Sequence, residues 1–145
     1  MQLGTDIAEW IDVERRYHVR VWLVSSTAMA GFPSPADDYL DRPLDFNELL
    51  IENPAATFAV HISGDSMIGI GIFPGDIAIV NRAKETFDRA IVLALVDGSF
   101  TVKRFRRRAG RVWLHAENPA YADIEIVGDM SFEVWGVITN TIRML

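Results

Sequence analysis

The chain has 145 residues, of which half are apolar and 10% aromatic, so it is long enough and apolar enough for one domain with a hydrophobic core. It contains no cysteine, which excludes a disulfide scaffold, a thiolate metal site and a cysteine nucleophile. Its formal net charge of −6 argues against a general nucleic-acid-binding protein.

The N-terminal region is predicted to be an arm. Residues 17–24 alternate weakly, which indicates a strand or an extended segment, and they are too short for a membrane span or a signal peptide. Residues 25–35 are mostly small and include two spaced prolines, a composition typical of an exposed, extended linker that proteases cut. We therefore expect a boundary in this linker, and a cytoplasmic protein without a membrane anchor.

A short helix is predicted after the linker. Asp45-Phe46-Asn47-Glu48 has the form of a capping box, in which side chains satisfy the free N–H groups at a helix start. The helix would continue through Leu49–Ile51 and end at Asn53-Pro54.

The remainder of the chain predicts a β-rich domain of about seven short strands, so the expected fold class is mainly β. Asp97-Gly98 is a strong two-residue hairpin signal, Ala109-Gly110 is a weaker one, and Pro74-Gly75-Asp76 marks another turn. The expected strands are Thr57–Ile62, Ile77–Asn81, Ala90–Val96, Ser99–Phe105, Arg111–His115 and a long run over Phe132–Ile142.

A basic cluster interrupts this acidic chain. Residues 103–111 hold six basic and no acidic side chains. The cluster is either a solvated hairpin or a docking patch for an acidic partner or DNA. The candidate partner-binding residues are Arg106, Arg107, Arg108 and Arg111.

Ser66 is a candidate nucleophile. It follows the strand ending at Ile62, in Ser63-Gly64-Asp65-Ser66-Met67, where a loop can present a hydroxyl and backbone N–H groups can face an oxyanion. Gly64, Asp65 and Met67 are the candidates for oxyanion or loop support. The same composition is also that of an ordinary turn.

The serine needs a base, and the candidates are the three histidines and Lys103. His61 alternates with apolar residues and is expected on a sheet face, while His18 and His115 have no aspartate in a triad-like setting. Strand alternation places Lys103 on the same face as Thr101. A lysine accepts a proton only when it is neutral, which requires a dry site.

Two other kinds of site are not supported by the sequence. The glycine run Gly69–Gly75 has the wrong spacing for a dinucleotide-binding loop, Pro74 interrupts the helix that should follow, and no βαβ unit surrounds it. Three dispersed histidines without a cysteine give no cluster of metal ligands. Neither a cofactor nor a metal is expected.

Taken together, the motifs resemble one family, the serine–lysine self-cleaving domain of LexA-type repressors and UmuD-type mutagenesis proteins. Gly31–Tyr39 and Asp45–Leu50 are more similar to UmuD than to LexA, and the resemblance covers about residues 28–143. The segments that carry it are Ala30-Gly31, Ser63–Met67, Gly71-Ile72, Gly75-Asp76 and Phe100–Arg104, in this order.

This resemblance implies a compact β domain of the LexA/UmuD C-terminal type, with Ser66 as nucleophile, Lys103 as general base and Ala30–Gly31 as the bond cut. Residues 1–30 would be an arm removed by self-cleavage, and residues 31–145 the peptidase and dimerisation domain. The resemblance further implies a homodimer of the SOS response to DNA damage. A RecA–single-stranded-DNA filament would stimulate its cleavage, and the product would be an accessory subunit of a UmuC-like Y-family DNA polymerase in error-prone translesion synthesis.

Other interpretations compete with this one. A LexA-like repressor would need a helix-turn-helix domain before the cut, and the 30 residues there lack a three-helix pattern, so direct sequence-specific DNA binding is not expected. A signal-peptidase-like serine–lysine protease would accept small residues such as Ala28-Met29-Ala30, but it would need a membrane anchor. A non-cleaving interaction module would keep the fold with an inactive pair.

Overall fold

The structure is a computed structural model that describes residues 7–11, 20–24 and 40–145. The predicted cleavage site, Ala30–Gly31, lies outside these residues together with the linker around it.

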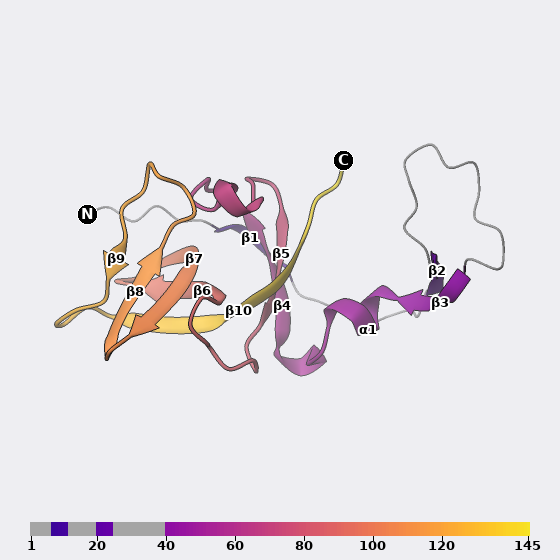
Figure 1. The fold of residues 1–145 in the computed structure, drawn as a ribbon, viewed down its shortest axis with the longest axis horizontal. Helices are drawn as coiled ribbons and strands as arrows, with labels where there is room; N and C mark the ends of the chain where they lie inside the picture. The colour runs from indigo at the N-terminus through magenta and orange to yellow at the C-terminus, as the bar shows by residue number, and fades with distance from the viewer. Residues whose placement is uncertain (1–6, 12–19, 25–39) are drawn as a thin grey trace.

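The described part of the chain is mainly β, as predicted. Its main sheet holds eight antiparallel strands in the spatial order β1-β4-β5-β10-β6-β7-β8-β9 (Figure 1). In chain order these strands are β1 (Ile7–Ile11), β4 (Thr57–Ile62), β5 (Ile77–Asn81), β6 (Ile91–Val96), β7 (Ser99–Arg108), β8 (Arg111–His115), β9 (Ile124–Glu125) and β10 (Phe132–Ile142).

A second, two-stranded sheet pairs β2 (Arg20–Val24) with β3 (Leu40–Asp45). Asp45 then caps helix α1 (Phe46–Leu50), because its carboxylate accepts the N–H of Asn47 at 2.9 Å. A single 3-10 turn (Pro54–Ala56) connects this helix to β4. The predicted helix is confirmed with Asp45 as its cap, although it ends at Leu50 and does not continue to Ile51, and Figure 1 shows it between the small sheet and β4.

Most expected strands have the predicted bounds, and the exceptions have a physical reason. β7 continues past Phe105 because its arginines pair with β8 as far as the register pair Arg108–Arg111. β1 and β9 are short segments without a clear signal of their own, and they become strands by pairing with β4 and β8.

Tight turns close the two hairpins that hold β7 between its neighbours. Asp97 and Gly98 have φ angles of 46° and 82°, and Ala109 and Gly110 have φ angles of 51° and 75°. Positive φ at both central residues belongs to the type I′ turn, whose twist matches that of paired strands. Both predicted hairpins are therefore confirmed, and β7 lies between β6 and β8.

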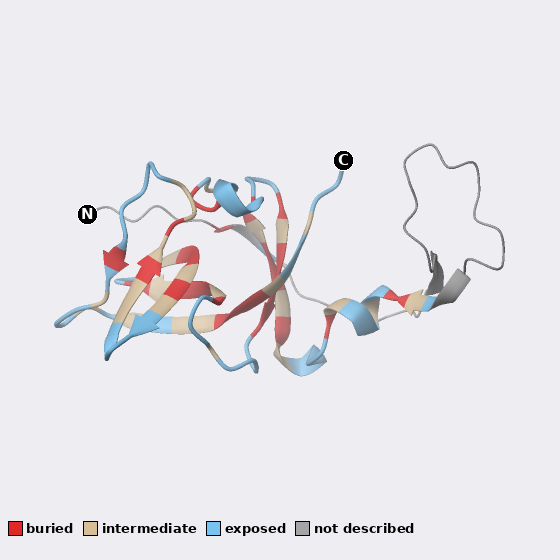
Figure 2. Ribbon diagram, in the orientation of Figure 1, coloured by how far each residue is buried: buried red, intermediate tan, exposed pale blue. Residues whose placement is uncertain are grey.

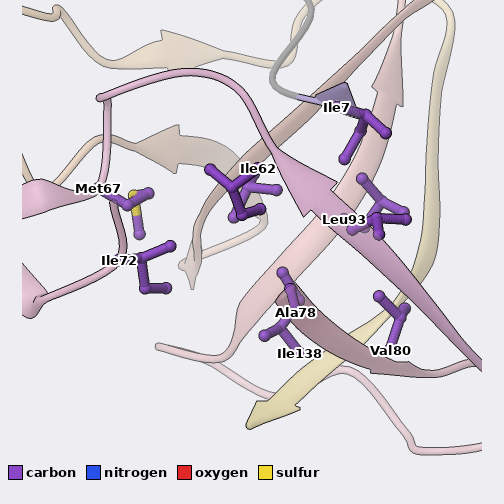
Figure 3. Packing of buried hydrophobic residues seen from close by; sticks show 10 residues of the cluster. Ile7, Ile62, Met67, Ile72, Ala78, Val80, Leu93 and Ile138 are labelled. Atoms are coloured by element: carbon purple, nitrogen blue, oxygen red, sulfur yellow. The ribbon is translucent and has the colours of Figure 1, made fainter. Parts of the chain in front are cut away.

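Hydrophobic clusters are buried on both faces of the main sheet. On β6, Leu93 packs in one cluster while Val92 and Ala94 pack in the other, so this strand is covered on both sides. Figure 2 shows the resulting buried residues along the centre of the sheet. Figure 3 shows the first cluster, in which Met67 and Ile72 from the loop after β4 join side chains of the strands.

Candidate active site

Ser66 lies in the loop that follows β4, and we call residues 63–72 the serine loop. The connection between β4 and β5 contains this loop, and its two ends are held together because the carbonyl oxygen of Ile62 accepts the N–H of Gly75 at 2.7 Å. Met67, the neighbour of Ser66, is packed into the core with 2% of its surface exposed. Because the core holds Met67, the backbone on the C-terminal side of Ser66 is anchored, and Ser66 itself is only 3% exposed.

Lys103 lies in the middle of β7, opposite Val92 of β6, and is 5% exposed. Its Nζ donates a hydrogen bond to Ser66 Oγ at 2.9 Å and another to Thr101 Oγ1 at 2.6 Å. A third bond runs to the carbonyl oxygen of Val102 at 3.2 Å. The bond to Thr101 requires the two side chains to share one face of β7, as strand alternation predicts.

The geometry around Ser66 Oγ suits proton transfer. Its hydroxyl lies 3.4 Å from the carbonyl oxygen of Val102 and 2.9 Å from Lys103 Nζ. A base must lie within about 2.6–3.2 Å of the group whose proton it takes, and the amine meets that condition. The tertiary structure therefore brings together two side chains that are 37 residues apart in the sequence, in a site that excludes most solvent.

The predicted support residues surround Ser66 in different ways. Gly64 is half-buried and Asp65 is exposed. The backbone oxygen of Asp65 accepts hydrogen bonds from Ile68 N at 3.4 Å and from Asn118 Nδ2 at 2.9 Å. Asp65 therefore connects the serine loop to a second segment that the sequence analysis did not single out.

One expectation about the histidines was wrong. His115 is not isolated from aspartate, because its Nδ1 lies 2.6 Å from Asp123 Oδ1. Asp123 lies eight residues away, across a loop that folds back, which the local sequence pattern does not reveal. The hydrogen bonds of Ser66 run instead to Lys103 and Val102. His61 is half-buried on β4, and His18 lies outside the described residues.

Surface carboxylates pair with two of the four predicted partner-binding arginines. Arg106 lies 3.2 Å from Asp88, and Arg111 lies 2.8 Å from Glu125. The guanidinium of Arg107 lies over the ring of Phe105, while its backbone N–H donates to Asp88 at 2.9 Å. This N–H and the Arg106 side chain together hold the pKa of Asp88 below its ordinary value. Arg108 is exposed beside the turn at the end of the hairpin.

A second buried charge lies near the serine loop and has no clear sequence signal. The Asp76 carboxylate is 2% exposed and accepts two hydrogen bonds from Arg143, both at 2.7 Å. These bonds from Arg143, with a third from the N–H of Phe73 at 2.8 Å, hold the pKa of Asp76 below its ordinary value, although burial acts in the opposite direction. The same Arg143 donates to the Gly71 carbonyl at 2.8 Å, which ties the end of the serine loop to the C-terminal residues.

Within residues 7–11, 20–24 and 40–145, no group of three or more histidine, aspartate or glutamate side chains could hold a metal ion. None of the helices described there is long and apolar enough to cross a membrane.

Fold and site together define a mainly β domain that carries a buried serine–lysine pair. The sequence profile of the peptidase S24-like proteins matches residues 23–139. The chain therefore belongs to the peptidase S24-like family, and the resemblance to the LexA/UmuD serine–lysine autopeptidases is confirmed.

Relatives of different length support this membership. Protein SamA of Salmonella typhimurium (strain LT2) is 41% identical over 121 residues, which cover 83% of this chain and 84% of SamA. Protein ImpA of Escherichia coli is 46% identical over 86 residues, which are 59% of each chain. The LexA repressor of Pseudomonas chlororaphis is 35% identical over 115 residues, which are 79% of this chain and 56% of the repressor.

Proposed function

We propose that this protein is a self-cleaving UmuD-type mutagenesis protein in which Ser66 is the nucleophile and Lys103 the general base. The observation that carries the proposal is the 2.9 Å hydrogen bond between Lys103 Nζ and Ser66 Oγ in a buried site. Burial favours the neutral form of an amine, because the charged form loses its hydration there. Membership of a family of serine–lysine autopeptidases supports the same assignment.

The proposed reaction cuts the peptide bond between Ala30 and Gly31. The proton of Ser66 Oγ moves to the neutral Nζ of Lys103 while Oγ attacks the carbonyl carbon of Ala30. The lysine ammonium then donates this proton to the nitrogen of Gly31, the peptide bond breaks, and an ester remains on Ser66. A water molecule hydrolyses the ester, which yields the Ala30 carboxylate and restores the serine.

Backbone donors are available for the negative charge that develops on the Ala30 carbonyl oxygen. Among the described residues, no carbonyl accepts the N–H of Ser66 or of Met67. Both groups lie at the start of the turn that carries the nucleophile, where fixed N–H dipoles can stabilise an oxyanion. We assign this role to Ser66 N and Met67 N, with Gly64 and Asp65 shaping the loop.

The biological role that we propose follows the UmuD side of the family. Self-cleavage would remove residues 1–30 of a cytoplasmic homodimer when a RecA–single-stranded-DNA filament forms after DNA damage. The product, residues 31–145, would then act as an accessory subunit of a UmuC-like Y-family polymerase. Because cleavage is intramolecular, delivery of the arm to Ser66 is expected to limit its rate.

Incubation of the purified protein at increasing pH tests the chemistry. We expect one cut, at Ala30–Gly31, whose rate rises with pH because the neutral fraction of a lysine rises with pH. Ser66→Ala and Lys103→Ala should each lower the rate at least about a thousandfold, since both members act as one unit. Mass spectrometry of the products locates the cut and measures its rate.

The chain offers matched controls for both substitutions. Ser63→Ala changes an exposed serine of the same loop, and Lys84→Ala changes the other lysine of the sequence, which is exposed. Both controls should cleave at the wild-type rate. Cleavage that persists in Ser66→Ala would contradict the mechanism. Absence of cleavage both in alkali and with an activated RecA filament would instead indicate the non-cleaving interaction module, and cleavage of an added signal peptide would indicate a signal-peptidase-like enzyme.

A further inference from the structure

The segment Glu117–Tyr121, which lies between β8 and β9, contacts the serine loop but takes no part in the proposed chemistry. We call it the clamp segment. Its hydrogen bonds to the serine loop run from Gly69 N to Glu117 O at 2.7 Å, from Glu117 N to Met67 Sδ at 3.4 Å, from Asn118 Nδ2 to Asp65 O at 2.9 Å, and from the Tyr121 hydroxyl to the Asp65 carboxylate.

These contacts lie on both sides of Ser66. Asp65 precedes the serine and Met67 follows it, and each is bonded to the clamp segment. The two segments approach so closely that a Cβ atom on Gly69 would overlap the backbone oxygen of Glu117. The clamp segment therefore fixes the backbone from which the Ser66 side chain projects.

Tyr121 contacts Lys103 and the residue that precedes Ser66. Its hydroxyl donates to Asp65, beside Ser66, and its ring centre lies 6.0 Å from Lys103 Nζ. Tyr121 is 45% exposed whereas Lys103 is 5% exposed, so the ring lies where the buried amine meets the solvent. Glu117, at the other end of the clamp segment, pairs at 2.5 Å with Arg104, the neighbour of Lys103 on β7.

We propose that the clamp segment positions the serine–lysine pair and that Tyr121 is its principal positioning residue. The Tyr121 hydroxyl holds Asp65 and with it the backbone of Ser66, while the Tyr121 ring keeps water away from Lys103. The catalytic consequence rests on the proposed self-cleavage, but the shielding of Lys103 does not. In this proposal Tyr121 acts through Asp65 and through the burial of Lys103, and it takes no part in the proton transfer.

The two parts of Tyr121 have separable effects. Without the hydroxyl, Asp65 loses one anchor, Ser66 samples more positions, and small misplacements of a nucleophile reduce rates strongly. Without the ring, water and dissolved reagents reach Nζ of Lys103 more easily. Tyr121→Phe removes the hydroxyl alone, whereas Tyr121→Ala removes both.

Chemical labelling of lysine tests the shielding without any cleavage. The sequence contains only two lysines, Lys84 and Lys103, and Lys84 is exposed and serves as internal reference. The full chain with Ser66→Ala, which stays intact, is treated with an N-hydroxysuccinimide ester, and labelling of each lysine is measured by peptide mass spectrometry. Tyr121→Ala should raise the ratio of Lys103 to Lys84 labelling by about tenfold or more, as expected when a protected group becomes exposed.

Three further variants complete the labelling experiment, two as controls and one as a second variant without the ring. Tyr121→Phe should leave the labelling ratio unchanged, and so should Phe87→Ala, which removes an exposed ring from the loop between β5 and β6. Tyr121→Gln is a second variant without the ring, in case Tyr121→Ala does not fold, and melting curves verify folding throughout. Equal protection of Lys103 in the wild type and in the folded variants without the ring would overturn the proposal.

Cleavage kinetics test the positioning in the otherwise wild-type chain. Tyr121→Phe and Asn118→Ala should each lower the rate about tenfold without moving the pH at which it is half-maximal. Tyr121→Ala should lower the rate further. The charged groups around the pair, Asp65, Arg104 and Glu117, are the same in all three variants.

Lysine labelling and cleavage kinetics together distinguish a failure of the positioning role from a failure of the proposed self-cleavage. Unchanged rates in Tyr121→Ala, Tyr121→Phe and Asn118→Ala would overturn the positioning role. A wild-type chain that never cleaves would instead defeat the proposed function, while the labelling result would still decide whether Tyr121 shields Lys103.

Discussion

Strand β7 passes through two environments in which basic side chains differ in exposure and in their partners. In its first half, Lys103 is buried and its Nζ donates to the oxygens of Ser66, Thr101 and Val102. In its second half, Arg106 is partly exposed and pairs with the Asp88 carboxylate. The local sequence, Lys-Arg-Phe-Arg-Arg-Arg, presents both halves as one basic cluster.

Position along the strand, rather than charge, therefore decides what a basic side chain can do. The Lys103 end of β7 pairs with β6, and Lys103 contacts Ser66 of the serine loop, so its side chain is removed from water. The hairpin end extends beyond the core, where arginine remains charged and forms surface ion pairs. Only the first environment favours a neutral amine that can accept a proton.

Exchange of lysine and arginine between the two halves gives the largest expected effect. Lys103→Arg keeps the positive charge, but arginine does not deprotonate in proteins, so self-cleavage should fall at least about a thousandfold. The reverse exchange, Arg106→Lys, should cleave at the wild-type rate. Gel densitometry over the alkaline pH range measures both. Substantial cleavage by Lys103→Arg would mean that Lys103 is not the base.

Removal of the second partner of Lys103 should have an intermediate effect. Thr101→Val deletes the hydroxyl that accepts from Nζ at 2.6 Å and leaves the amine free to shift away from Ser66. We expect the cleavage rate to fall about tenfold, because proton transfer depends on a fixed geometry.

Thr57→Val is the matched control for this substitution. Thr57 is also buried, and its hydroxyl donates to Asn53 O at the same distance, 2.6 Å, but it lies at the start of β4. This variant should lose about 1 kcal/mol of unfolding free energy in urea titration without a change in cleavage rate. If the two threonine variants lowered the cleavage rate equally, general destabilisation would explain both.

Charge reversal in the exposed half should have the smallest effect on cleavage. The triple substitution of Arg106, Arg107 and Arg108 by glutamate should leave alkaline self-cleavage within about twofold, because exposed pairs contribute little. The melting temperature should fall slightly at neutral pH. RecA-stimulated cleavage and polymerase binding, measured with the same variant, test the hairpin as a partner-binding surface, and unchanged values for both would remove that role.

The contribution of Asp88 to the stability of the fold depends on pH, and the direction of this dependence follows from its lowered pKa. The pKa of Asp88 in the folded protein lies below its ordinary value, so its contribution to stability is present above the ordinary carboxyl range. The contribution is lost as the pH falls through the lowered pKa. The difference in melting temperature between the wild type and Asp88→Asn should therefore disappear in acid, and a difference that persisted there would point to another cause.

Local patterns in the sequence were sufficient for much of the fold. Alternation gave the bounds of β4, β5, β8 and β10, and the turn residues Asp97-Gly98 and Ala109-Gly110 gave two hairpins. Strand period and turn chemistry are short-range properties, so neighbouring residues reveal them. The small strands β1 and β9 were not apparent, because each depends on pairing with a partner far away in the chain.

The features of the candidate site also fall into two groups, those that local sequence patterns reveal and those that depend on contacts between distant segments. The sequence predicted the residue types, the two segments that carry Ser66 and Lys103, and the face of β7 that Lys103 shares with Thr101. The 2.9 Å distance between Ser66 Oγ and Lys103 Nζ became apparent only in the folded chain, as did the pairing of Asp123 with His115. The tertiary structure also placed Tyr121 beside Asp65 and Lys103. Distances and burial arise from contacts between segments remote in sequence, which no local pattern encodes.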